Sequence, residues 1–359
     1  MKAEKSDNRS KKIIVAPLNW GLGHATRCIP IIKALEGSGY QVVIASDGDP
    51  LSLLAKEFPG RECLELPSYN VRYPRNGWLL KLKLMARMMD FKKVMKAEAS
   101  VIAAYIAKNQ IDGIISDNRF GVHNKAVTSV FITHQVRVLS GSTTWLSSRM
   151  HRQIIDKFDE CWIPDLKGPA NLSGKMGHPK KDRNRFKYIG TLSRLKKKEL
   201  PIEHDILCLL SGPEPQRSLL ERCLLDCFAD DRRSILLVRG VINRPPRPGK
   251  TGNVRVVDYL TSAQLEQALN ASRLVICRSG YSTLMDLAKL EKKAFLIPTP
   301  GQFEQQYLAK RLKEKGIAPY CEQADFDVDK LHQLAAYSGF KWLAAPGPLS
   351  GLFGLFEGE

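Results

Sequence analysis

The sequence contains no CxxC pair, no complete Walker motif and no apolar run that approaches the roughly 18 residues of a membrane-spanning helix. Its eight cysteines, at positions 28, 63, 161, 208, 223, 227, 277 and 321, lie mostly within apolar runs such as DILCLLSG. This pattern indicates reduced, buried side chains and argues against a disulfide or zinc framework. The first twelve residues are polar and lack the pattern of a signal peptide, so we expect a cytoplasmic protein.

Acidic residues are scarce in the first half of the chain. Residues 1–203 contain 35 Lys and Arg against 19 Asp and Glu, whereas residues 204–359 contain 20 against 18. Such an asymmetry favours an anionic partner for the first half: nucleic acid, an anionic membrane surface or a phosphorylated substrate. A solvated basic surface is the simpler alternative. Because no aromatic-rich RNA-binding pattern and no helix-turn-helix pattern occurs, we expect no nucleic acid partner.

Short apolar runs of strand length alternate with longer helix-like segments along most of the chain. The runs include KKIIVAP, YQVVIAS and DGIISD in the first half, and DILCLLSG, SILLVRG and RLVICR in the second. They are rich in Val and Ile on both faces, as buried parallel strands are. The alternation breaks at about 165–203, in a stretch rich in Gly, Pro and Lys. We therefore predict an α/β fold with two doubly wound, Rossmann-like domains, 1–190 and 203–359, that face each other across a cleft.

A glycine turn connects the first predicted strand to a helix, in the stretch LNWGLGHATR at 18–27. Gly21 and Gly23 fit a dinucleotide fingerprint, but Thr26 stands where its third glycine would be. Asp47 follows the second strand, as in a nicotinamide enzyme, so this alternative stays open. The turn also leaves backbone amides free at a helix N-terminus, which suits an anionic oxygen. His24 begins this helix and could act as a general base or cap the helix.

A second stretch with functional side chains spans 274–308, LVICRSGYSTLMDLAKLEKKAFLIPTPGQFEQQYL. Its first strand ends in a turn, and Ser282 then opens a helix whose amides and hydroxyls could bind an anion. Asp286 lies one turn further on the same face, where its carboxylate could accept both hydroxyls of a ribose. The adjacent amides of Gln305 and Gln306 suit sugar hydroxyls, because each amide offers a donor and an acceptor.

RSGYSTLMD followed by IPTPGQFEQQYLAKRLKEKGIA resembles the donor-binding half of glycosyltransferase family 28, the MurG-like enzymes. The turn Gly21-Leu22-Gly23-His24 is similar to the glycine-rich turn of the same family. The resemblance implies the GT-B fold and transfer of a sugar, a hexose or N-acetylhexosamine, from a UDP-linked donor to a lipid-linked or cell-envelope acceptor. Two positions depart from the family pattern: Asp286 replaces a Glu, and Tyr281 is large where a small residue is common.

The resemblance also implies which residues bind the donor. Asp286 would bind the ribose, Gln305 and Gln306 the sugar, and the turn at 281–283 the α-phosphate. The segments ending in Ser211-Gly212 and Tyr259-Leu260 would flank the diphosphate and the uracil. Together with the glycine turn, the expected donor residues are Gly21, Gly23, Ser211, Gly212, Tyr259, Leu260, Arg278, Ser279, Gly280, Tyr281, Ser282, Thr283, Asp286, Gln305 and Gln306.

Catalysis by this family implies inversion, with a base that deprotonates the acceptor hydroxyl. His24, Asp117 and His134 are the candidates, since each ends a strand or opens a helix of the first domain. Asp117 could instead cap a helix, and His134 could simply pair with a neighbour. No metal-binding pattern stands out, so we expect no obligatory metal and no cofactor beyond the co-substrate. A UDP-N-acetylglucosamine 2-epimerase-like enzyme and a non-catalytic nucleotide-sugar-binding subunit remain alternatives.

Residues 72–96, RYPRNGWLLKLKLMARMMDFKKVMK, concentrate the positive charge. They hold eight Lys and Arg and one acid, Asp90, with bulky apolar residues in two helical stripes. Such a segment suits a helix that touches an anionic bilayer, although a core helix with a basic outer face gives the same pattern. We therefore expect a peripheral attachment to the inner face of the plasma membrane.

Overall fold

The structure is a computed structural model that describes residues 9–69, 88–179, 184–212, 214–241, 249–340 and 347–357. The first domain is built on a seven-stranded sheet in which every neighbouring pair is parallel. In spatial order its strands are β3 (Cys63–Glu65), β2 (Gln41–Ser46), β1 (Lys12–Pro17), β4 (Gly113–Asp117), β5 (Thr128–Ile132), β6 (Glu160–Ile163) and β7 (Phe186–Tyr188).

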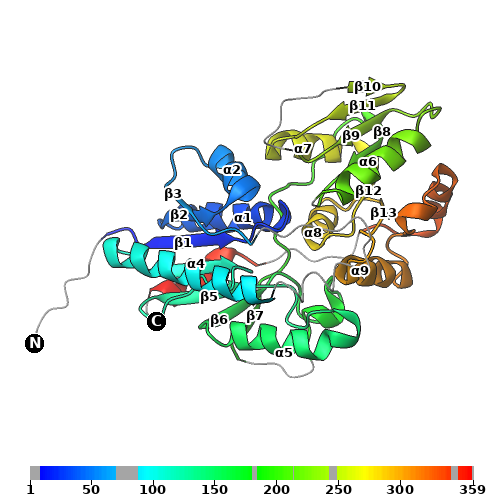
Figure 1. Ribbon diagram of the computed structural model, residues 1–359. Helices are drawn as coiled ribbons and strands as arrows, with labels where there is room; N and C mark the ends of the chain where they lie inside the picture. Colours follow the sequence, from blue (N-terminus) through cyan, green and yellow to red (C-terminus); the bar gives the residue numbers. More distant parts are fainter. Residues whose placement is uncertain are drawn as a thin grey trace, which may run out of the picture.

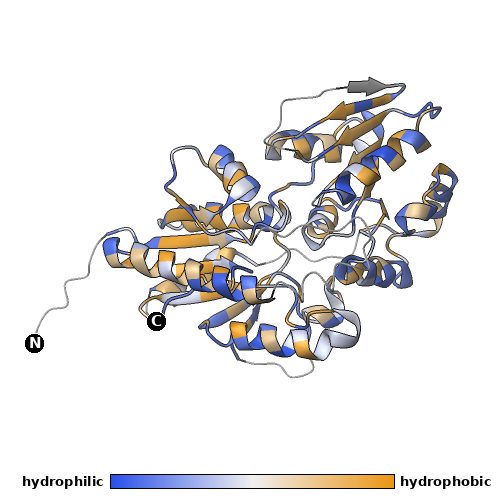
Figure 2. Cartoon of the chain, in the orientation of Figure 1, coloured by the Kyte–Doolittle hydropathy of each residue, from blue (hydrophilic) through white to orange (hydrophobic). Residues whose placement is uncertain are grey.

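Helices cover both faces of this sheet, which is why its central strands are mostly apolar and buried. Ile13 and Ile14 point to opposite faces of β1, yet both are fully buried. The covering elements are α1 (Gly23–Gly37), α2 (Gly48–Glu57), α4 (Met88–Lys108), α5 (Thr144–Ile155) and the short turns η2 (Gly141–Thr143) and η3 (Gly174–Met176). Figure 2 shows the resulting contrast between apolar strands and polar outer faces of helices.

The second domain has a six-stranded sheet with strands β10 (Gly249–Thr251), β11 (Val254–Val257), β9 (Ile235–Val238), β8 (His204–Leu209), β12 (Ser272–Cys277) and β13 (Ala294–Leu296). All pairs are parallel except β10 with β11. Its helical elements are α6 (Gln216–Cys227), α7 (Ser262–Asn270), α8 (Tyr281–Lys289), α9 (Phe303–Glu314), η4 (Gln323–Asp325) and η5 (Val328–Ala336). Two doubly wound α/β domains are therefore confirmed (Figure 1).

The C-terminal segment departs from the predicted domain boundary. We expected residues 203–359 to form the second domain, but η6 (Leu349–Phe356) packs on the first (Figure 1). The ring of Phe353 lies 5.8 Å from that of Tyr40, and the ring of Phe356 lies 6.4 Å from that of Trp162. A Cβ on Gly113 would lie 2.3 Å from Phe356, so only glycine leaves room there. Apolar contact with β4 and β6 thus ties the end of the chain to the first domain.

No helix within the described residues is both long and apolar enough to cross a membrane. The segment 72–87, which carries most of the predicted membrane-binding residues, lies outside those residues. Only the end of the predicted segment is described, in the first turns of α4. There Met89, Lys92, Lys93 and Lys96 are exposed, while Phe91 packs on Tyr69 with 5.6 Å between their ring centroids.

Candidate active site at the domain interface

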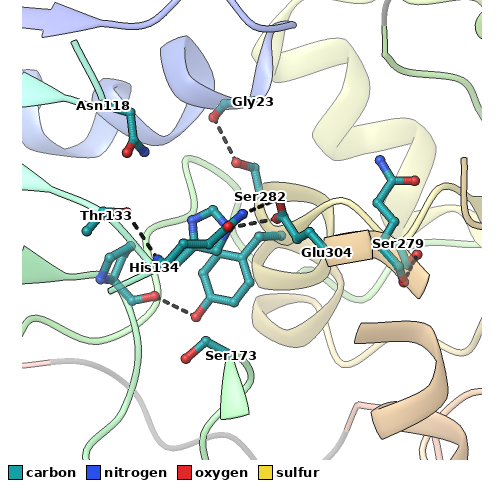
Figure 3. Close-up of polar contacts among 12 residues, drawn as sticks. Gly23, Asn118, Thr133, His134, Ser173, Ser279, Ser282 and Glu304 are labelled. Carbon is teal, nitrogen blue, oxygen red and sulfur yellow. Dashed lines mark hydrogen bonds and ion pairs between the residues drawn. The ribbon is translucent and has the colours of Figure 1, made fainter. Parts of the chain in front are cut away.

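The two domains meet where the first turns of α1 and α8 face each other. Gly21 adopts a positive φ of 87° and allows the chain to turn from β1 into α1. Neither α1 nor α8 has a side-chain cap at its N-terminus. The Ser282 hydroxyl donates a 2.8 Å hydrogen bond to the Gly23 carbonyl, and a Cβ on Gly23 would lie 2.9 Å from that hydroxyl (Figure 3). Two uncapped N-termini therefore converge, an arrangement that favours bound anions.

His24 and Asp117 lie together beside this contact. Asp117 ends β4 and is fully buried, and its Oδ1 lies 2.9 Å from His24 Nδ1. Arg27, one turn along α1, donates to both oxygens of the same carboxylate, with Nε 2.5 Å from Oδ2. The charges of Arg27 and His24 outweigh the effect of burial and hold the pKa of Asp117 well below its ordinary value. Asp117 is thus an ionised carboxylate whose oxygens are already occupied.

The tautomer of His24 follows from these contacts. Arg27 Nη2 also lies 2.9 Å from His24 Nδ1, but Nη2 already donates a hydrogen bond to Asp117 Oδ1. If the proton is assigned to His24 Nδ1, Asp117 accepts hydrogen bonds from both His24 and Arg27. The lone pair of the imidazole is then on Nε2. Burial lowers the pKa of His24, helped by the charge of Arg27 and opposed by Asp117. Since 16% of its side chain is exposed, His24 is the best placed of the three candidates to act as a base.

Both ring nitrogens of His134 are engaged. Arg27 Nη1 lies 3.1 Å from Nδ1, and Nε2 lies 2.7 Å from Glu304 Oε1 on α9. The imidazole also stacks on Tyr281 with 4.1 Å between ring centroids. Burial would raise the pKa of Glu304, but His134 and the nearby charges lower it. These contacts make His134 a link between the domains and leave it no nitrogen for an acceptor proton.

The large side chain of Tyr281 also links the domains. Its hydroxyl donates a 2.9 Å hydrogen bond to the Pro164 carbonyl, in the loop after β6. This contact and the stack on His134 account for a large residue where the resembling family often has a small one. Thr283 follows in the same first turn of α8 and is half-buried.

Arg278 and Ser279 both make hydrogen bonds that hold loops of the second domain together. Arg278 is fully buried and donates to the carbonyls of Ile297, Pro298 and Gln216, and to the Gln323 side chain. Burial lowers its pKa to about 10. The Ser279 hydroxyl donates to the Gln305 carbonyl at 2.8 Å, and Gly280 is the N-cap residue of α8. Nη1 and Nη2 thus hold loops together, whereas the buried Nε has no hydrogen-bond partner among the described residues, and the expected donor contact of Arg278 stays a prediction.

Asp286 is held next to the connection between the domains. The Ser193 hydroxyl donates a 2.6 Å hydrogen bond to Asp286 Oδ1. Burial raises the pKa of Asp286 to about 6, against the opposing effects of Arg194 and Ser193. Arg194 also opposes the burial effect on the pKa of Tyr259, so its guanidinium lies near both residues.

The Arg194 nitrogens Nε and Nη1 are buried and have no hydrogen-bond partner in the part of the chain that the structure describes. Buried guanidinium nitrogens without acceptors are costly, and an anionic ligand could bind these two. Sequence reasoning missed this residue because it stands among the basic residues of RLKKK. Arg27 and Glu304 were missed as well, since their partners Asp117 and His134 lie 90 and 170 positions away.

The remaining expected donor residues lie at the carboxyl ends of strands in the second domain. Ser211 and Gly212 follow β8, and Gly212 has a φ of 94°. Tyr259 and Leu260 follow β11 and pack against the main hydrophobic core. This edge of a parallel sheet is where doubly wound folds bind ligands.

The two glutamines have different surroundings. Gln305 is buried, and its Oε1 accepts a 2.8 Å hydrogen bond from the Thr299 amide, which fixes the loop before α9. Gln306 instead lines a cavity of about 470 Å³ between η2 and α9. Gln305 therefore supports the loop through Oε1, Gln306 faces open space, and the predicted contact of both amides with a sugar stays a prediction.

Asp47 does not have the free carboxylate that the nicotinamide alternative requires. Its Oδ1 accepts a 2.9 Å hydrogen bond from the buried Arg119, and its Oδ2 accepts one of 2.8 Å from Asn19. Within the described ranges, no group of three or more His, Cys, Asp or Glu is placed to hold a metal ion.

Comparison with known proteins agrees with this architecture. Residues 237–336 match the family model of the glycosyltransferase family 28 C-terminal domain. An uncharacterized glycosyltransferase of Methanosarcina acetivorans is 23% identical over 333 residues, which cover 85% of this chain and 84% of that protein.

The UDP-N-acetylglucosamine–N-acetylmuramyl-(pentapeptide) pyrophosphoryl-undecaprenol N-acetylglucosamine transferase of Shewanella oneidensis is 24% identical over 335 residues, 89% of this chain and 86% of that protein. The crystal structure of Acinetobacter baumannii MurG superposes with a TM-score of 0.59 and 12% identity. The match covers 98% of this chain and all of that one, which gives the chain the GT-B fold.

Proposed function

We propose that this glycosyltransferase of the family 28, MurG-like type transfers a sugar from a UDP-linked donor to an acceptor. The transferred sugar would be a hexose or an N-acetylhexosamine. The acceptor would be a lipid-linked or cell-envelope glycan. The surroundings of Asp286 carry the donor proposal: it lies one turn from the uncapped N-terminus of α8, and its carboxylate feels the charge of Arg194, whose buried Nε and Nη1 have no hydrogen-bond partner among the described residues. Carboxylate, guanidinium and free amides match the ribose hydroxyls and the diphosphate of such a donor.

The proposed reaction inverts the configuration of the transferred sugar. His24 Nε2 removes the proton from the acceptor hydroxyl, whose oxygen attacks the anomeric carbon on the face opposite UDP. The bond between that carbon and the diphosphate oxygen breaks, and its electron pair leaves with UDP. The amides of α1 and α8 and the Arg194 guanidinium stabilise the departing charge. Asp117 orients His24 and stabilises the imidazolium that forms. The proposal includes no metal cofactor.

Incubation with a panel of UDP-sugars and acceptor extracts tests this function. A transferase releases UDP only when an acceptor is present and yields a product heavier by one sugar. An epimerase would change the configuration of the UDP-sugar without an acceptor, and a non-catalytic subunit would bind the donor and leave it intact. Either of these two outcomes would contradict the proposal.

We further propose that the first domain attaches to an anionic bilayer. The described part of α4 presents three exposed lysines, Lys92, Lys93 and Lys96, next to Met89, which is 67% exposed. Each such cation near an anionic surface contributes about 1 kcal/mol. Phe91, on the opposite side, packs inward on Tyr69, so the lysine face of α4 is free to meet a surface.

Vesicle sedimentation measures this attachment directly. Wild-type protein should bind vesicles that contain phosphatidylserine, bind less as salt rises, and ignore vesicles of phosphatidylcholine. Changing Lys92, Lys93 and Lys96 to Gln should weaken binding. The matched control changes three exposed lysines of the second domain, Lys289, Lys293 and Lys313, and should bind as the wild type does. Equal binding to both vesicle types would contradict the proposal.

A further inference from the structure

The cavity that Gln306 lines lies between the two domains. One side is formed by the segment from Arg137 to the first residue of α5, and the other by the first turns of α9. Its volume of about 470 Å³ would accommodate a group of small-ligand size. The residues around it are Arg137, Leu139, Gly141, Thr144, Lys175, Phe303, Gln306, Tyr307, Lys310 and Tyr320.

Three cations and no acidic residue line this cavity. Arg137, Lys175 and Lys310 are all exposed, and they come from three separate segments. The Arg137 guanidinium has no hydrogen bond or ion pair with the residues that the structure describes, whereas its backbone amide is fixed by a 2.8 Å bond to the Met176 carbonyl. Lys175 Nζ lies 5.0 Å from the centre of the Tyr307 ring, and Lys310 Nζ lies 3.9 Å from Glu314. Three like charges around one hollow attract an anion.

The other walls of the cavity are apolar. Phe303 is 41% exposed, and Leu139 and Tyr320 are half-buried beside it. Immediately after Thr144, which lines the cavity, Trp145 and Leu146 are 67% and 47% exposed on the first turn of α5. Exposed aromatic and apolar side chains next to a cluster of cations suit a molecule with an anionic group joined to an apolar part.

The cavity is connected to the candidate active site through α9. Phe303 and Gln306 line it, and Glu304 between them bonds to His134, which contacts Arg27. Tyr307 holds its far wall, where the hydroxyl accepts a 3.0 Å hydrogen bond from the Lys175 amide. A ligand in the cavity would therefore contact α9, the helix that carries Gln306, whose amide is expected to bind sugar hydroxyls.

We propose that this cavity is a subsite for a phosphate or carboxylate group of the acceptor, held by Arg137, Lys175 and Lys310. The apolar rim favours a phosphate carried by a lipid over an acidic sugar. This inference rests on the proposed function, because it takes UDP to occupy the separate site at Asp286 and Arg194.

Calorimetry on the full chain saturated with UDP tests the subsite. The probes are farnesyl diphosphate and farnesol, used below their micelle-forming concentrations, and glucuronate and glucose. Farnesyl diphosphate should bind more tightly than farnesol, and its affinity should fall as salt rises. The double variant Arg137→Gln/Lys310→Gln should bind it at least about tenfold more weakly, since hydrogen bonds to charged groups are lost. The control Lys289→Gln/Lys293→Gln keeps the charge change but lies outside the cavity, and should match the wild type.

The outcomes separate this inference from the proposed function. Binding of glucuronate without binding of farnesyl diphosphate would support the subsite and assign it to an acidic sugar. Equal affinity for farnesyl diphosphate and farnesol, or an unchanged double variant, would overturn it. Weaker UDP binding in the double variant would also overturn it, by assigning the cations to the donor. Failure of the wild type to bind UDP would contradict the proposed function instead.

Discussion

Replacing His24 with alanine removes the candidate base that keeps an available proton acceptor, Nε2. The polar atoms of the other two candidates, Asp117 and His134, are engaged by neighbouring residues. Asp117 keeps its two hydrogen bonds from Arg27, so the variant should stay folded. Loss of a positioned general base typically lowers kcat by about 10²–10⁴-fold, which corresponds to about 3–5 kcal/mol of transition-state stabilisation. UDP affinity should hardly change, because Asp286 and Arg194 belong to the second domain and the connection.

The pH profile gives this prediction a sharper test. Burial and Arg27 lower the pKa of His24 below 6.5, so the neutral, basic form prevails at neutral pH. At saturating donor, where the protonation of Asp286 does not limit the rate, kcat should therefore be flat around pH 7 and fall only below pH 6.5, as His24 becomes protonated. This acid limb should vanish in His24→Ala.

The assay is the rate of UDP release with the donor and acceptor that the substrate panel identifies. His204→Ala is the matched control, because His204 lies at the start of β8, where its Nδ1 is 3.5 Å from the Ser234 hydroxyl and no candidate site residue is its hydrogen-bond partner among the described residues. A loss of only a few fold, or a fall in UDP affinity as large as the fall in rate, would refute the role of His24 as the base.

Three further predictions follow from other parts of the structure. Arg278→Ala should lower the free energy of unfolding in urea by about 3 kcal/mol or more, since four acceptors lose a charged donor; unchanged stability with lost UDP affinity would restore its donor role. Phe356→Ala should lower the free energy of unfolding by about 3–5 kcal/mol, whereas Ser350→Ala, at an exposed position, should leave it unchanged. Equal stability of the two variants would contradict the docking of η6. UDP affinity should fall as pH drops through about 6, where Asp286 gains its proton, and more steeply than in Asp286→Asn; parallel pH curves would argue against a ribose contact.

The sequence predicts the fold well because its signals are local. Runs of Val and Ile buried on both faces specify parallel strands, as at Ile13 and Ile14, and glycine turns such as Gly21 mark where strands pass into helices. The return of η6 to the first domain has no such signal. Its apolar residues show no clear period, and their partners Tyr40 and Trp162 lie far away in sequence.

The candidate site is predictable in its residue types but not in its pairings. His24 and Asp117 are both candidates for the base, and the preference for His24 depends on their 2.9 Å contact and on the bonds of Arg27 to Asp117. Arg278 has the charge expected of a phosphate ligand, and only the structure shows that two of its nitrogens bond to loop carbonyls while the buried Nε has no partner among the described residues. These distinctions depend on tertiary contacts that residue type and spacing do not encode.

The central claim, that the second domain binds a uridine diphosphate through its ribose, is tested most directly by comparing UDP with 2′-deoxy-UDP in calorimetric titrations of wild-type protein and Asp286→Ala. If Asp286 accepts both ribose hydroxyls, the wild type should bind UDP at least about tenfold more tightly than the deoxy form, the effect of a hydrogen bond to a charged group. Asp286→Ala should bind the two nucleotides equally and weakly. Equal affinities in the wild type, or a preference for UDP that survives in Asp286→Ala, would contradict the account.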